Sequence, residues 1–289
     1  LNNQQIKKSN LDLEIAKDYV GGRGFCAKFL WDRTEPGLEP LSPDNPLMFL
    51  LGPITGIIGG GHTCVGFKSC ETNTIGHSIT GGSWGSELKY AGYDGLIIKG
   101  RTEYPTYLSI HDGDVDIKKA EHLWGKGVTE TEKTIKNELE DDRVRVLSCG
   151  PAGEKLVRFA SIVQESWRAA ARGGPGAVMG SKNLKAVAVR GTQGIHLNDN
   201  SRCFEIIDKF TRRINENGSI FGAYGGKRYG TTTSQLLFAG KGQLAVKNQR
   251  EGDWKDLKEI GGIRLERRNM ISSAACNGCT ASDLQISVV

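Results

Sequence analysis

The strongest constraint on the fold is a glycine- and arginine-rich segment, residues 168–185, which reads RAAARGGPGAVMGSKNLK. Glycine backbone N–H groups can approach a bulky anion closely, and a guanidinium such as that of Arg168 or Arg172 binds two phosphate oxygens at once. The order GSK near its end excludes a P-loop, in which Gly-Lys-Ser/Thr opens a helix. The residues alone leave two interpretations open: a phosphate-binding segment, or a tight turn between a helix and a buried strand at residues 186–189.

The composition is that of a globular protein with a sizeable core. The chain has 289 residues, 38% hydrophobic and 25% charged, which is enough for one large or two modest domains. The net charge of +5 is spread among acidic residues, which argues against nucleic-acid binding and suits an anionic cofactor. No apolar run is long enough to span a bilayer and no signal peptide is visible, so we expect a cytoplasmic protein without membrane contact.

Seven cysteines, an odd number with one close pair, favour reduced thiols over a disulfide framework. The close pair, Cys276 and Cys279, has the C-x-x-C spacing that lets two thiolates bind one iron–sulfur cubane or one zinc ion. The same spacing occurs in dithiol redox sites, although these usually lie near a βαβ unit that is not evident here. The residues alone leave these three chemistries open.

Short apolar or alternating runs bounded by Gly, Pro or Asp predict strands at residues 47–51, 95–99, 106–111, 115–118, 144–148, 156–162 and 186–189. Helices are predicted at residues 24–33, 83–91 and 129–139, the last with Thr129 as its capping residue. Because strands and helices do not alternate regularly, we expect an α+β fold and not a doubly wound sheet.

The pattern changes beyond residue 194. Apolar residues recur at spacings of three and four over residues 201–215, which predicts an amphipathic helix. We therefore expect a β-rich domain at residues 1–194 and the beginning of a helical domain at residues 195–289, ending in the C-x-x-C pair.

A possible dinucleotide motif is present at residues 22–27, where GRGFCA matches G-x-G-x-x-A. A Rossmann fold requires a buried strand before this motif, whereas residues 13–20 look helical. A nicotinamide site is therefore disfavoured.

Seven motifs occur in this chain in a fixed order. They are GGRGFCAK (21–28), PLSPDNP (40–46), LGPITG (51–56), GGSWGSELKYAGYDG (81–95), LWGK (123–126), GPAGE (150–154) and the 168–185 segment. In this order they resemble the N-terminal domain of the aldehyde ferredoxin oxidoreductase family, over residues 11–189. The resemblance implies a layered β-sheet base domain that lies under two pyranopterins.

The resemblance also implies cofactors, a reaction and partners. The family holds tungsten, sometimes molybdenum, between two pyranopterin dithiolenes, with Mg²⁺ bridging the pterin phosphates and a [4Fe-4S] cluster nearby. It oxidises small aldehydes to carboxylic acids and passes the electrons to ferredoxin, and a homodimer is compatible with it. Family members continue well beyond this length, so the chain resembles a truncated member. A non-catalytic remnant or binding module that retains only the base domain is the alternative, and a relative acting on a sugar-phosphate aldehyde or an aromatic thioester is a further one.

Carried over position by position, the resemblance implies cofactor-binding roles for His62, Ile79, Gly81, Arg168, Ala169, Ala171 and Arg172. Arg168 and Ala169 match positions that contact the pterin and its bridging Mg²⁺, and Gly81 matches a pterin-contacting glycine. Three positions depart from the family pattern, with His62 in place of Arg, Ile79 in place of Asn and Ala171 in place of Gly. Because neutral histidine lacks the charged fork of arginine, His62 predicts a weaker phosphate contact.

For the iron–sulfur cluster, the resemblance implies Cys276, Cys279 and Asp283 as ligands. Asp283 occupies the position of the family's third cysteine, and the fourth cysteine would lie beyond residue 289. A carboxylate is a harder donor than a thiolate, so this pattern predicts a more labile cluster site. We name no catalytic acid or base, since the family's proton-transfer residues also lie beyond residue 289.

Overall fold

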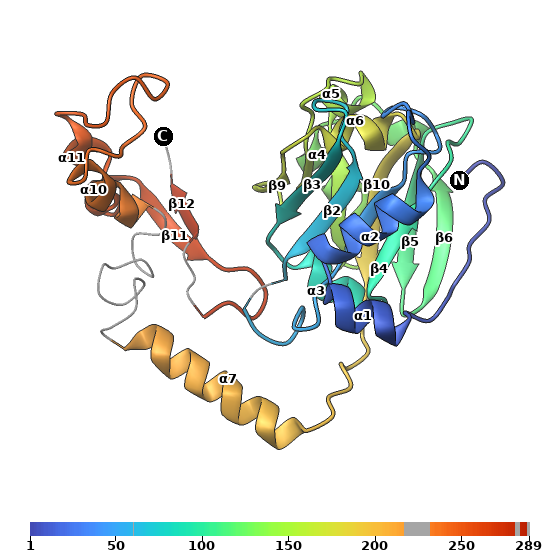
Figure 1. The fold of residues 1–289 in the computed structure, drawn as a ribbon, viewed down its shortest axis with the longest axis horizontal. Coiled ribbons are helices and arrows are strands. Elements are labelled where there is room, and N and C mark those ends of the chain that lie inside the picture. The colour runs from blue at the N-terminus through green and yellow to red at the C-terminus, as the bar shows by residue number, and fades with distance from the viewer. Residues whose placement is uncertain (60, 217–231, 281–283, 288–289) are drawn as a thin grey trace. The chain divides into compact units, whose positions relative to one another are not determined.

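The computed structural model describes residues 1–59, 61–216, 232–280 and 284–287. The chain divides into two compact units, unit 1 (Leu1–Ile195) and unit 2 (His196–Val289) (Figure 1). Unit 1 combines two sheets with several helices in no regular β-α-β order. This arrangement confirms the predicted α+β class.

The first sheet of unit 1 is antiparallel, with the strand order β3-β2-β1-β4. Its strands are β1 (Leu47–Leu50), β2 (Thr63–Lys68), β3 (Ile75–Thr80) and β4 (Gly95–Ile98). The apolar runs predict β1 and β4 correctly but give no sign of β2 and β3. Gly66 interrupts the strand pattern of β2, and packing requires it, because the Cys26 sulfur lies 2.4 Å from where a Cβ at this position would stand.

The second sheet is mixed, with the order β6-β5-β10-β7-β8-β9 and one parallel pair, β5 with β10. Its strands are β5 (Thr106–His111), β6 (Asp114–Lys119), β7 (Arg145–Cys149), β8 (Ile162–Gln164), β9 (Arg168–Ala170) and β10 (Leu184–Arg190). The prediction of a strand over 156–162 is wrong. Leu156 has a left-handed φ of 57°, and the Ala160 N–H donates to the Val157 carbonyl in a turn, so the strand begins only at Ile162.

The helices of unit 1 are α1 (Leu13–Tyr19), α2 (Arg23–Arg33), α3 (Trp84–Tyr90), η1 (Glu121–Leu123), α4 (Val128–Glu138), α5 (Pro151–Glu154) and α6 (Pro175–Gly180). The helices predicted at 24–33, 83–91 and 129–139 are confirmed as α2, α3 and α4. The prediction that Thr129 caps α4 is wrong, because the helix begins after Gly127 and the Thr129 hydroxyl lies 3.1 Å from Ser166 Oγ instead.

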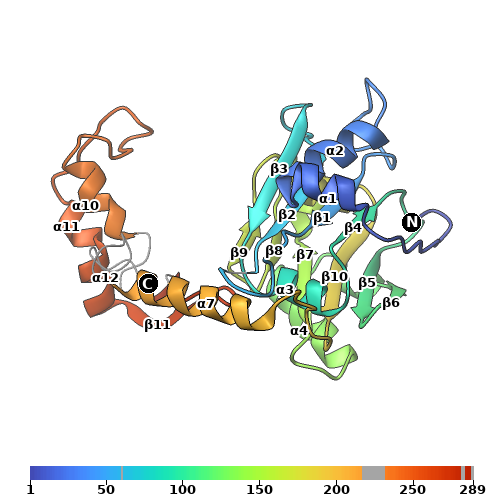
Figure 2. The same cartoon turned by 60° about the horizontal axis from the view of Figure 1, so that its bottom comes forward.

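The two sheets share one hydrophobic core, to which α3 and α6 contribute. Trp84 of α3 connects the sheets: its ring packs on Phe49 of β1 and its Nε1 donates to the Val187 carbonyl of β10 at 2.9 Å. Every residue of α6 is buried. Helix α2 packs on the outer side of the first sheet and α4 on the outer side of the second (Figure 2), which gives unit 1 its layers.

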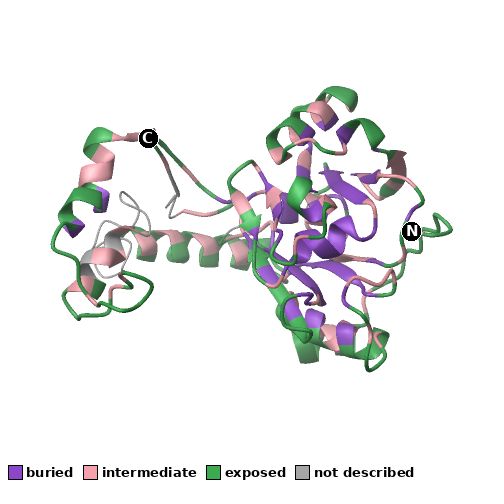
Figure 3. Ribbon diagram, turned by 90° about the horizontal axis from the view of Figure 1, so that it is seen from above, coloured by how far each residue is buried: buried purple, intermediate pink, exposed green. Residues whose placement is uncertain are grey.

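Unit 2 contains α7 (Asn200–Asn215), α10 (Thr233–Ala239), α11 (Leu257–Ile260), α12 (Gly262–Arg268) and the antiparallel pair β11 (Met270–Ala274) and β12 (Leu284–Ser287). Helix α7 confirms the amphipathic helix predicted over 201–215, and Asp199 caps it by accepting from the Arg202 N–H. None of its residues is buried, and Phe204 is 66% exposed (Figure 3). Across the described residues of the chain, no helix combines the length and apolarity needed to cross a membrane.

Lys182 of unit 1 is fully buried, and its ammonium donates to the Pro43 carbonyl at 2.8 Å. Burial, partly opposed by Asp44, lowers the pKa of Lys182 from 10.5 to about 8. The unfolded chain therefore binds this proton more tightly than the folded chain does. The free energy of unfolding should consequently rise, by up to about 3 kcal/mol, as the pH increases from 8 to 10.5.

The variant Lys182→Met should lack this rise in stability. Urea unfolding of both proteins at several pH values across the window measures the difference. Parallel pH profiles for the two proteins would contradict the assignment of a depressed pKa to Lys182.

Candidate functional site

Arg168 occupies the first position of β9, the edge strand of the six-stranded sheet. Antiparallel pairing sets it directly opposite Gln164 of β8, so the two side chains lie on the same face. The guanidinium atoms Nε and Nη2 are buried, and neither has a hydrogen-bond partner within the part of the chain that the structure describes. Because buried charged donors without an acceptor are costly, this geometry fits an anion bound at Arg168.

The Gly81 loop, residues 81–83, connects β3 to α3 and is held against β8. Gln164 Nε2 donates to the Gly81 carbonyl at 2.5 Å, and Gln164 Oε1 accepts the Trp84 N–H at 3.0 Å. Gly82 has a φ of 108°, and a Cβ there would lie 2.7 Å from Gln164 Oε1, so the loop requires glycine at this position. The residue that contacts Gly81 is therefore also the cross-strand neighbour of Arg168.

The other predicted cofactor-binding residues lie close to these two segments. Strands β3 and β9 run side by side (Figures 1 and 2), and the Arg172 N–H donates to Ser78 Oγ of β3 at 3.1 Å. Ala169, Ala171 and Arg172 are exposed. Ile79 of β3 is 53% exposed, and the exposed His62 immediately precedes β2. Since β2 begins opposite the end of β3, His62 and Gly81 extend from the same end of this strand pair.

The glycines of the 168–185 segment have a packing role in this structure. Gly174 has a φ of 81°, and a Cβ there would lie 1.9 Å from the Arg158 carbonyl. A Cβ at Gly176 would lie 2.4 Å from the Ser161 carbonyl oxygen, and one at Gly180 would lie 2.0 Å from the Gly153 carbonyl oxygen. For the glycines the structure favours the tight turn over the phosphate-binding segment, and the anion-binding features of the segment are confined to its arginines.

The C-x-x-C pair lies in unit 2, in the turn that follows β11. Cys276 is buried and Cys279 half-buried, the Cys279 N–H donates to the Cys276 carbonyl at 3.0 Å, and Gly278 has a φ of 69°. A turn of this kind can present two thiolates to one metal or cluster. Asp283 lies outside the described residues. Within the described ranges no group of three or more His, Cys, Asp or Glu residues is placed to hold a metal ion.

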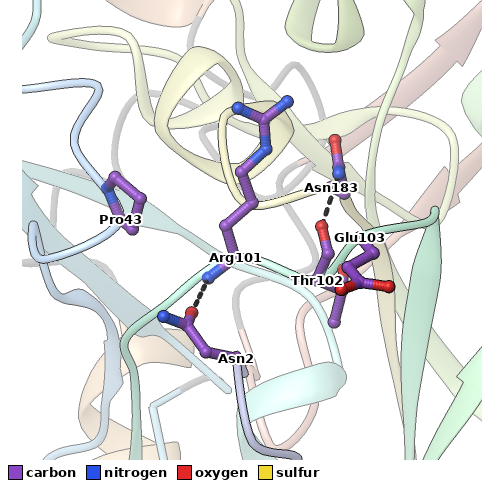
Figure 4. Close-up of a pocket in the computed structure, with 6 residues that line it drawn as sticks. All are labelled: Asn2, Pro43, Arg101, Thr102, Glu103 and Asn183. Atoms are coloured by element: carbon purple, nitrogen blue, oxygen red, sulfur yellow. Dashed lines mark hydrogen bonds between the residues drawn. The ribbon is translucent and has the colours of Figure 1, made fainter.

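A pocket of about 420 Å³ also exists in unit 1 (Figure 4). It is lined by Asn2, Pro43, Arg101, Thr102, Glu103 and Asn183. None of these residues has a predicted cofactor-binding or metal-binding role, although Pro43 and Asn183 lie within two of the motifs. Two of its amides are already engaged: Asn183 Nδ2 donates to the Thr102 carbonyl at 2.6 Å, and Asn2 Oδ1 accepts the Arg101 N–H. The candidate site is therefore the Arg168 and Gly81 region and not this pocket.

Comparison with known proteins gives a family match over most of the chain. Residues 1–191 match the model of the aldehyde ferredoxin oxidoreductase N-terminal domain. The chain is 39% identical over 276 residues to the tungsten-containing aldehyde ferredoxin oxidoreductase of Pyrococcus abyssi, which covers 95% of the chain and 45% of that protein. It is 38% identical to the protein of the same name from Pyrococcus furiosus, covering 96% of the chain and 46% of that protein. The chain thus spans about half the length of the curated relatives it matches.

Two further relatives have other names. The chain is 32% identical to the aliphatic sulfonate oxidoreductase, WOR-like subunit, of Pyrococcus furiosus, over 99% of the chain and 48% of that protein. Its structure is similar to the active site complex BamBC of benzoyl coenzyme A reductase in complex with 1,5-dienoyl-CoA. The TM-score is 0.83 and the sequence identity 32%, over 99% of this chain and 45% of the other.

Proposed function

The chain belongs to the aldehyde ferredoxin oxidoreductase family, and we propose that unit 1 is the pterin-binding base of a tungsten-dependent oxidoreductase. The proposed reaction is oxidation of a small aldehyde by water to a carboxylic acid, which releases two protons and two electrons. A [4Fe-4S] cluster would supply the electron transfer to ferredoxin. The names of the curated relatives support the tungsten cofactor and the aldehyde substrate.

The unpartnered guanidinium of Arg168 is the observation that carries this proposal. Two of its nitrogens are buried without an acceptor among the described residues, on a strand position directly opposite Gln164, which contacts Gly81. A pterin phosphate would supply acceptors for both nitrogens, since guanidinium and phosphate form paired charge-assisted hydrogen bonds. The residues present therefore fit a phosphate-bearing cofactor at this position.

The bound tungsten or molybdenum pterin would supply the two-electron chemistry, and the chain's own residues would bind and orient it. Arg168 would bind a phosphate, and the exposed Ala169, beside it on β9, would contribute to the bridging Mg²⁺ site. The Gly81 loop would permit close approach of the pterin because its glycines carry no side chain. His62, Ile79, Ala171 and Arg172 would line the same region.

The turn at Cys276 and Cys279 would provide two thiolates to the [4Fe-4S] cluster, with Asp283 as a third ligand. The backbone of this turn supports such a role, because the positive φ of Gly278 lets the chain fold back between the two cysteines.

The similarity to BamBC favours one alternative substrate class, an aromatic acyl thioester. The same pterin-binding base would serve both reactions, because Arg168 and the Gly81 loop would bind the cofactor and not the substrate. Assays of the full-length protein with an aliphatic aldehyde and with an aromatic thioester separate the two.

Anaerobic purification of the full-length protein tests the proposed function. We expect tungsten or molybdenum, pterin released on oxidation, and about four irons per chain, as a cubane requires. A protein with iron or zinc and no pterin would contradict the enzyme proposal and support a remnant that retains only the base domain.

A further inference from the structure

We propose that Gln164 and Glu165 are positioning residues, which fix the Gly81 loop relative to Arg168 and thereby keep the pterin cofactor bound. The inference rests on the proposed function. Both residues lie at the tip of the β8–β9 hairpin and reach a loop about eighty residues earlier in the chain.

Gln164 joins the two halves of the candidate site. Its side chain is 1% exposed, and its amide forms three hydrogen bonds to the segment around the Gly81 loop. Nε2 donates to the Gly81 carbonyl at 2.5 Å and to Thr80 Oγ1 at 3.3 Å, and Oε1 accepts the Trp84 N–H at 3.0 Å. On β8 it lies directly opposite Arg168. Gln164 thus links the loop directly to the strand position opposite Arg168.

Glu165 fastens the same loop one residue further along. Its Oε1 accepts the Ser83 N–H at 3.0 Å, so the two neighbouring side chains bind both ends of the loop. Ser166, the next residue of the turn, is hydrogen-bonded at its Oγ to the Thr129 hydroxyl of α4 at 3.1 Å. The hairpin tip is therefore anchored on both sides.

The backbone of the tip is strained, which is consistent with a positioning role. Glu165 and Ser166 both have left-handed φ values, of 50° and 61°, although neither is glycine. Such conformations persist only where surrounding contacts hold them, and they concentrate at ligand clamps. The contacts to Ser83 and Thr129 provide that support here.

A matched control, Asn45, separates positioning from general stability. This amide is also buried and also forms three hydrogen bonds, all of them to backbone: to the Pro40 carbonyl, and to the carbonyl and N–H of Lys68. Lys68 lies at the opposite end of the β2–β3 pair from Thr80. Gln164→Leu and Asn45→Leu should therefore destabilise the fold similarly, but only the first should loosen the Gly81 loop.

The experiment measures the rate at which pterin leaves the anaerobically purified full-length protein. Released pterin is collected in the filtrate of an ultrafiltration membrane and detected by its fluorescence after oxidation. The unfolding temperature of each variant is measured in parallel. We expect release from Gln164→Leu to be roughly tenfold faster than from Asn45→Leu, because loss of an oriented polar contact typically changes equilibria by about this factor. Glu165→Gln keeps the Oε1 acceptor and should behave as wild type, whereas Glu165→Ala should release pterin faster. The Glu165 pair keeps the test decisive should Gln164→Leu fail to fold.

Equal release from Gln164→Leu and Asn45→Leu, or from Glu165→Ala and Glu165→Gln, would overturn the inference. The variant Arg168→Ala distinguishes this failure from failure of the proposed function. If Arg168→Ala loses pterin while the Gln164 and Glu165 variants do not, the positioning role of Gln164 and Glu165 is refuted and the cofactor contact at Arg168 is retained. If Arg168→Ala also retains pterin fully, the proposed cofactor contact itself is refuted.

Discussion

Replacing Arg168 with alanine should remove most of the pterin cofactor from the purified full-length protein. Each charge-assisted hydrogen bond to a buried anion contributes about 1.5–3 kcal/mol, so losing the guanidinium should weaken cofactor retention by at least the roughly 10- to 100-fold that one such bond provides. The effect should be large because Nε and Nη2 are buried and would otherwise have no acceptor among the described residues. Pterin content per folded chain, after anaerobic gel filtration, measures it.

Two arginine variants serve as comparisons for Arg168→Ala. Arg172→Ala should have a smaller effect, because the Arg172 side chain is exposed and its hydrogen bond to Ser78 is made by the backbone N–H. Arg143→Ala should have no effect on pterin content, since Arg143 is an exposed residue that pairs with Asp141 in the turn before β7. Equal pterin content in the Arg168 and Arg143 variants would contradict a phosphate contact at Arg168.

Breaking the buried ion pair of Lys185 and Glu154 should strongly destabilise unit 1. The Lys185 ammonium contacts Glu154 Oε1 at 2.5 Å and the Lys126 carbonyl at 2.7 Å, and the two side chains are 0% and 5% exposed. Lys185→Met leaves the Glu154 carboxylate buried, with a hydrogen bond from the Gly125 N–H to its other oxygen. We expect a loss of about 3–5 kcal/mol in the free energy of unfolding.

The matched control is Lys209→Met, which removes an exposed pair with Glu205 on α7 and should cost less than about 1 kcal/mol. The double variant Lys185→Met/Glu154→Gln should recover part of the lost stability, because it removes the uncompensated charge and keeps an acceptor for Gly125. Urea unfolding of the four proteins measures both effects. Similar losses for Lys185→Met and Lys209→Met would refute the buried pair as a stabilising contact.

The hydrophobic pattern predicts those helices and strands in which apolar residues recur at a regular spacing along the chain. Helices α2, α3, α4 and α7 and the apolar strands β1 and β10 are examples. Strands β2 and β3 are not predicted, because their sequences lack a regular apolar strand pattern. In β2, for example, Gly66 interrupts the pattern, and close packing against Cys26 requires glycine there. Strand β9 coincides with a segment whose alanines and arginines carry no strand pattern.

The candidate site is only partly predictable for a different reason. Motif order indicates Arg168 and Gly81, but no periodicity or spacing connects either with Gln164 and Glu165. Those contacts join residues more than eighty positions apart and depend on the register of β8 with β9. The glycines near Arg172 show the converse: their pattern suggests anion binding, whereas close packing of α6 against residues 153–161 accounts for them.

The most direct test of the central claim is an experimental structure of the anaerobically purified full-length protein, with tungsten located by its anomalous scattering. We expect a pterin phosphate within hydrogen-bonding distance of Arg168 Nε and Nη2, beside the Gly81 loop. A cofactor bound elsewhere, or an Arg168 guanidinium paired with a carboxylate of the same protein, would contradict this claim.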